Sequence, residues 1–198
     1  MTQPSFARAN GGVRAALLVG AVLAATLGAA SIVAATAPGP SYLAVTDWSA
    51  VAQNGNAVRL TATTNAPIPR HPDAFIGETE IVGIAWADLG TGTALVATIH
   101  PLHGRDSAQR PDGWHLHTVQ LSGGATAPND FCLVDVLSTP TAGISIQGST
   151  MTVRVAASSL PDAGSGPIAV GAIDAAVGFT VHKEDAGCAT GLGVRLRT

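Results

Sequence analysis

Histidine side chains are concentrated in one short part of this chain. Four of the six histidines lie between positions 100 and 117, namely His100, His103, His115 and His117. Histidine is the commonest metal ligand in proteins and the side chain whose charge changes nearest neutral pH. Several imidazoles within a stretch the size of one hairpin therefore predict a metal site, or a site for proton transfer, in this part of the chain.

The spacing of His115 and His117 indicates where their side chains point. Both lie in residues 113–121, a segment whose alternation is typical of a β-strand. Side chains two positions apart on a strand share a face, and this face continues with Val119 and Leu121. We expect the pair at one mouth of the core, where shielding from water favours the neutral, metal-binding form of imidazole.

The other two histidines of the segment are placed to complete a ligand set. A predicted strand ends at His100, and His103 lies in the connection 101–112 that leads to His115 and His117. Connections of this length are uncommon in compact domains and are often functional. We predict that copper or zinc is bound by His115, His117 and His103, with His100 as the fourth ligand.

A purely structural role for the same histidines stays open. Asp106 and Asp112 lie in the connection, and a carboxylate can accept a hydrogen bond from an imidazole N–H. Around a metal, such bonds would orient the ligands. Without a metal, they would pin the connection to the strands, and the protein would be a structural or adhesive surface module.

Other kinds of active site lack residues that they need. A blue-copper site needs a cysteine ligand, and neither cysteine has a histidine within four positions. The stretch Gly113 to His117 resembles the first copper-ligand strand of copper-zinc superoxide dismutases, but the downstream histidines of that family are missing, so no activity is carried over. A metallohydrolase would need three ligands, an open position and a carboxylate base. We therefore favour metal binding without turnover over catalysis.

Composition narrows the class of protein. Hydrophobic residues make up 46% of the chain and charged residues 12%, which excludes a highly charged disordered chain. The formal net charge is −3 and no basic run exceeds a pair, so nucleic acid is not an expected partner. Lys183 is the only lysine, and no phosphate-binding glycine motif precedes it.

The N-terminus has the pattern of an export signal. Arg8 and Arg14 precede an uncharged apolar stretch over 15–37 that ends in small residues. We expect residues 1–37 to be a cleaved signal peptide or a retained hydrophobic anchor, although the glycines before the stretch also allow a prepilin-like leader. A linker over 38–43 and a single domain over 44–198 would follow, secreted or held at the cell surface.

The two cysteines agree with an extracytoplasmic location. Cys132 and Cys188 are the only ones in the chain, and exported pairs usually oxidise. We predict a disulfide between them. Cys132 shares its strand face with Val134 and Val136, which predicts that it points inward.

The rest of the chain predicts an all-β fold. Segments of period-two alternation or continuous apolar character are separated by turn sequences rich in glycine, asparagine and serine. The expected strands cover 57–63, 81–89, 94–99, 113–121, 131–137, 144–146, 151–156, 168–173, 176–181 and 194–197. Roughly ten short strands of this kind indicate a β-sandwich or a Greek-key barrel, preceded by the hydrophobic N-terminal helix.

Overall fold

The computed structural model describes residues 40–54, 56–70, 81–100, 113–123, 130–160, 170–183 and 187–197. These residues form ten β-strands and three short 3-10 helices, so the predicted all-β fold is confirmed. The strands are β1 (Val45–Gln53), β2 (Ala57–Thr64), β3 (Ile81–Asp88), β4 (Thr93–Ile99), β5 (His115–Ser122), β6 (Asp130–Ser138), β7 (Gly143–Gln147), β8 (Thr150–Ala156), β9 (Ala175–Lys183) and β10 (Leu192–Arg197).

The predicted signal or anchor over 1–37 lies outside the described residues. Within the described parts, no helix is both long and apolar enough to cross a membrane. The first described element is the 3-10 helix η1 (Ser41–Leu43), in the segment expected to be a linker. It buries Tyr42 and Leu43, so these two side chains belong to the packed domain.

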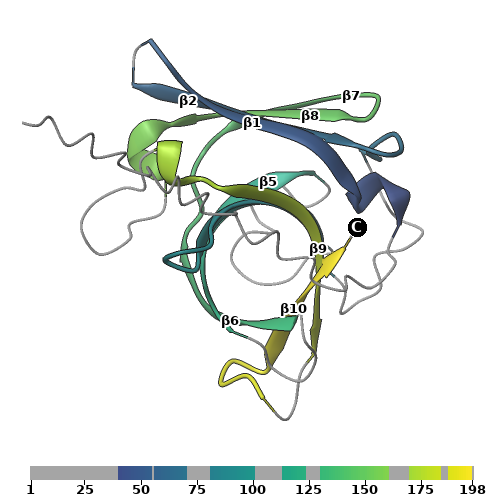
Figure 1. Ribbon diagram of the computed structural model, residues 1–198, viewed down its shortest axis with the longest axis vertical. Coiled ribbons are helices and arrows are strands. Elements are labelled where there is room, and N and C mark those ends of the chain that lie inside the picture. The colour runs from purple at the N-terminus through teal and green to yellow at the C-terminus, as the bar shows by residue number, and fades with distance from the viewer. Residues whose placement is uncertain are drawn as a thin grey trace, which may run out of the picture. The chain divides into compact units, whose positions relative to one another are not determined.

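The strands form two hydrogen-bonded systems. An antiparallel four-stranded sheet has the order β1, β2, β8, β7. The other six strands close into a barrel in the order β10, β6, β5, β4, β3, β9, with β9 pairing back onto β10. Figure 1 looks along the barrel, whose strands form a ring beneath the sheet. The structure thus combines a closed barrel with a sheet on its wall.

The larger hydrophobic core lies between the sheet and the wall of the barrel. Alternate side chains of β2 and β8 face it, among them Leu60 and Val153, which are both fully buried. From the barrel, Trp86 on β3 is 1% exposed, and its Nε1 donates a hydrogen bond of 3.1 Å to the Thr61 carbonyl oxygen on β2. Trp86 therefore joins the two systems through both burial and a hydrogen bond.

A second core lies inside the barrel. Ala85 on β3 and Val96 on β4 belong to it, whereas their neighbours Ile84 and Leu95 belong to the core under the sheet. Both faces of these strands are therefore buried. This explains why β3 and β4 read as continuous apolar runs in the sequence and not as alternating ones.

One strand prediction is wrong, and one strand was not predicted. The segment 168–173 was expected to be a strand, but its described part forms the 3-10 helix η4 (Val170–Ala172). A short apolar run has no periodicity that distinguishes a strand from a short helical turn. Conversely, β1 was not predicted, because a register shift between Val45 and Asp47 interrupts its alternation at the edge of the sheet.

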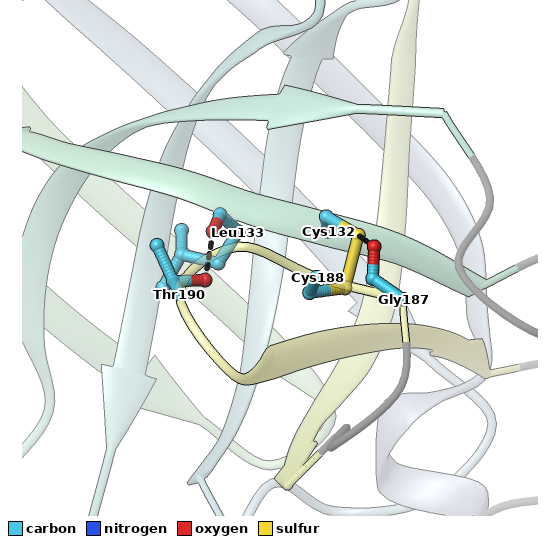
Figure 2. Close-up of a disulfide and its surroundings, with 5 residues drawn as sticks. All are labelled: Cys132, Leu133, Gly187, Cys188 and Thr190. Carbon is cyan, nitrogen blue, oxygen red and sulfur yellow. Dashed lines mark hydrogen bonds between the residues drawn. A yellow bond between two sulfur atoms is a disulfide. The ribbon is translucent and has the colours of Figure 1, made fainter.

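The predicted disulfide between Cys132 and Cys188 is present, with Cα atoms 5.2 Å apart. It ties β6 to the segment that leads into β10 (Figure 2). Beside it, the Thr190 hydroxyl donates a hydrogen bond to the Leu133 carbonyl oxygen of β6. The segment before β10 is thus held against β6 by a covalent bond and a hydrogen bond.

Cys132 is buried as predicted, at 7% exposed, but it does not line the inside of the barrel and does not share a buried face with Val134. Its neighbours Phe131 and Leu133 belong to the core inside the barrel, whereas Cys132 does not, and Val134 is 46% exposed. Val136 does line the barrel interior, because register shifts between β5 and β6 change which side chains face inward. Period-two alternation cannot show which face of a strand is the inner one.

Candidate metal site

Three of the predicted histidines meet at one end of the barrel. His115 and His117 lie at the start of β5, and His100 directly follows the last residue of β4. The two strands are antiparallel neighbours in which Thr98 pairs with His115 and Val96 pairs with His117. The end of β4 therefore lies beside the start of β5, which brings His100 to the histidine pair.

The three imidazoles are close enough together to bind one metal ion. One potential ligand nitrogen from each ring lies within 4.8 Å of those of the other two. Nitrogens that share a tetrahedral zinc at about 2.0–2.1 Å are about 3.3–3.4 Å apart. The nitrogens of His100, His115 and His117 are thus near the spacing that a common metal ion requires, and the three residues could hold one. We call these residues the three-histidine cluster.

Hydrogen bonds define the tautomer of His115. Its Nδ1 lies 3.0 Å from the Gly113 carbonyl oxygen, which can only accept, so Nδ1 carries the proton. The Nε2 of the neutral ring is then an acceptor, and it lies 2.9 Å from Nε2 of His100. In this arrangement His100 donates through Nε2. A backbone carbonyl that holds one ring nitrogen and directs the other at a metal is the usual arrangement for ligating histidines.

The second imidazole of β5 is more deeply placed. His117 is 7% exposed, whereas His100 and His115 are half-buried. The Nδ1 of His117 lies 3.4 Å from the Thr139 hydroxyl oxygen, a long contact on the side of the ring toward β6. The rings of His115 and His117 meet edge to face, with centroids 4.8 Å apart. The cluster is thus shielded on the barrel side and more open at His100 and His115.

The three-histidine cluster stands at the mouth of a cavity inside the barrel. The cavity has a volume of about 410 Å³, and His100 and His117 line it together with Thr98. Further along the same face of β5, Val119 and Leu121 also line it. Of the predicted pair, His117 thus lines the apolar interior of the barrel, and the ring of His115 contacts the ring of His117 beside it.

The remaining predicted site residues cannot be compared with the cluster. His103, Asp106 and Asp112 lie in the connection 101–112, outside the described residues. His100 was predicted only as a fourth ligand, after His115, His117 and His103. In the structure it lies together with His115 and His117.

Sequence reasoning missed the cavity and its lining residue Thr98. The signal that could have revealed it is the run of small side chains on one face of β3, at Gly83, Ala85 and Ala87.

Comparisons with protein-family models, with curated proteins and with solved structures find no match to this chain.

Proposed function

We propose that this protein binds one divalent transition metal, copper or zinc, through His100, His115 and His117. The observation that carries the proposal is the convergence of the three imidazoles, each with a potential ligand nitrogen within 4.8 Å of the others. Neutral imidazole is a good ligand for both copper and zinc. The hydrogen bond of His115 to the Gly113 carbonyl supports the same conclusion, because it directs Nε2 toward the cluster.

We propose that binding takes place outside the cytoplasm, at the cell surface or in a secreted form. The disulfide supports this location, because disulfides persist in oxidising compartments. The export-signal pattern of the N-terminal sequence agrees with it. The role that fits best is metal binding or delivery without turnover.

A metallohydrolase is the less favoured reading of the same cluster. Three protein ligands leave one position of a tetrahedral site for water or another ligand. Hydrolysis would also need a carboxylate base, and the cluster itself holds histidines alone among the described residues.

A structural role is the second candidate, and one observation favours it. His115 already bonds to Gly113 and to His100 without a metal, so the imidazoles could brace the ends of β4 and β5. The two candidates differ in one measurable respect. A brace stabilises the fold whether or not metal is added, whereas a metal site is stabilised by mass action when metal is added.

Titration of the full chain with zinc and with copper separates the candidates. We expect one metal ion to bind per chain and the melting temperature to rise. At a free metal concentration of about 100 Kd, the free energy of unfolding should increase by about 2.7 kcal/mol. His117→Ala should abolish tight binding. The matched control is His182→Ala, which removes a histidine of β9 outside the cluster and should leave metal binding unchanged.

Two results would count against the metal site. One is a wild-type melting curve that neither metal moves. The other is equal metal binding by the His117→Ala and His182→Ala variants. If the cluster only braces the strands, His117→Ala should destabilise the domain by about 1–3 kcal/mol with no dependence on metal.

A further inference from the structure

The interior of the barrel is hollow, although most barrels of this size are filled by side chains. The cavity of about 410 Å³ is lined mostly by apolar residues, and all six strands of the barrel contribute to its lining. Two of the lining side chains on β3 are small, those of Ala85 and Ala87, which leaves room in the interior. We call this cavity the lumen.

The shape of the lumen depends on one close contact. Gly83 lies beneath the ring of Phe179, and a Cβ at this position would come within 2.6 Å of the Phe179 Cζ atom and 2.4 Å of the Ala97 carbonyl oxygen. The glycine therefore lets the Phe179 ring approach β3 more closely than a side chain at position 83 would allow. This leaves the middle of the barrel open, with Phe179 as part of its lining.

The volume of the lumen suits a small lipid-like molecule. An apolar cavity of about 150 Å³ binds one benzene molecule. The lumen, at about 410 Å³, is nearly three times as large and has room for on the order of a dozen carbon atoms by the same comparison. Ligand sites in proteins begin at about 300 Å³ and are mostly apolar, with a few polar groups that orient the ligand.

The polar groups of the lumen lie at its two ends. His100, His117 and Thr98 line one end, and Asp88 and Thr93 line the other. The register of β3 and β4 separates them, because Asp88 pairs with Thr93 at the start of β4, whereas the histidine end is at the finish of that strand. An occupant therefore meets imidazoles at one end, whereas the Asp88 carboxylate at the other end accepts hydrogen bonds from the backbone N–H groups of Gly90 and Thr91.

We propose that the lumen binds a straight-chain carboxylate of on the order of a dozen carbon atoms, with its tail in the lumen and its carboxylate on the metal of the three-histidine cluster. This inference rests on the proposed metal site. Three neutral imidazoles leave a divalent metal with its full positive charge, which a carboxylate ligand would partly neutralise. At the opposite end, the backbone N–H groups of Gly90 and Thr91 already donate to the Asp88 carboxylate, so they are not available to a ligand carboxylate.

The first experiment is a chain-length series on the full chain loaded with one equivalent of zinc and freed of excess metal. Hexanoate, octanoate, decanoate, dodecanoate and hexadecanoate are titrated by calorimetry. Affinity should rise roughly fourfold for each methylene that the lumen buries, and it should stop rising once the lumen is full. Absence of binding, or affinity that is independent of chain length, would overturn the proposal.

The second experiment uses a matched pair of substitutions. Val96 lines the lumen, and Val134 lies on the outside of the barrel and is 46% exposed. Val96→Phe should weaken dodecanoate binding by at least about tenfold and leave zinc binding intact, whereas Val134→Phe should change neither. Equal dodecanoate affinity in the two variants would overturn the proposal. If Val96→Phe does not melt cooperatively, Val119→Phe replaces it, and the chain-length series on the wild type decides by itself.

The third experiment tests the carboxylate and separates this inference from the proposed function. Dodecanoate should bind the zinc-loaded protein at least about tenfold more tightly than the zinc-free protein, whereas dodecan-1-ol should show no such dependence. Equal dodecanoate affinity with and without zinc would overturn the placement on the metal. If zinc itself does not bind, both the proposed function and this inference fail. If zinc binds and dodecanoate does not, only this inference fails.

Discussion

Nε2 of His115 lies 2.9 Å from Nε2 of His100, while Nδ1 of His115 lies 3.0 Å from the carbonyl oxygen of Gly113. A carbonyl can only accept, so the proton of a neutral His115 ring is on Nδ1 and the bond between the two rings runs from His100 to His115. The end of β4 and the start of β5 are joined by this bond, and the acceptor nitrogen of His115 is the one that a metal would take.

This relationship predicts the tautomers of the metal-free protein. Nitrogen-15 NMR of the imidazoles should show His115 protonated at Nδ1 and His100 protonated at Nε2. Zinc should remove the coupling between the two rings, because the metal replaces the hydrogen bond at Nε2 of His115. A His115 ring protonated at Nε2 in the metal-free protein would contradict the arrangement.

Metal affinity should depend on pH in one direction. An imidazole must be neutral to bind a metal, so protons compete with the ion at His100, His115 and His117. We expect zinc affinity to fall by more than about tenfold between about pH 7.5 and about pH 5.5. Calorimetric titration at several pH values measures this. Affinity that stays constant over the interval would show that zinc is not held by imidazoles.

The disulfide should contribute strongly to stability. Cys132 and Cys188 are separated by 56 positions, and closing such a loop stabilises the fold by about 4 kcal/mol in the chain-entropy model. The double variant Cys132→Ser/Cys188→Ser should lose about this much free energy of unfolding in urea. The control is reductant, which should lower the stability of the wild type and leave the double variant unchanged. Equal stability of the two proteins without reductant would contradict the prediction.

A second stability prediction concerns the contact between η1 and the barrel. A Cβ at Gly178 on β9 would lie 2.0 Å from the Leu43 carbonyl oxygen, so backbone would have to move. Gly178→Ala should therefore cost about 1–3 kcal/mol. At Gly143 on β7 nothing lies within 4 Å of such a Cβ, so Gly143→Ala is the matched control and should be close to neutral. Chemical denaturation of both variants gives the comparison, and equal stability would show that η1 does not pack closely on β9.

The local sequence pattern was sufficient to predict many of the strands and the shared strand face of His115 and His117. Alternation identified β2 and β8, because one face of each strand packs on the core and the other does not. The same period placed His115 and His117 on one face that continues into Val119, and the two imidazoles do lie together, with His117 lining the lumen. These properties follow from backbone geometry within a single strand, so sequence spacing determines them.

Other properties depend on contacts between strands that are distant in the sequence. Strand β9 pairs with both β3 and β10 and so closes the barrel. Because of this closure, one face of β5 lines the inside of a barrel, whereas in a sandwich it would face a second sheet. The register of β4 against β5 brought His100 to His115, and register shifts between β5 and β6 put Val136, but not Cys132, on the inside of the barrel. Only the tertiary structure decided these points, because strand pairing and closure are set by the packing of the whole domain, whereas the alternation of one strand is the same for either face.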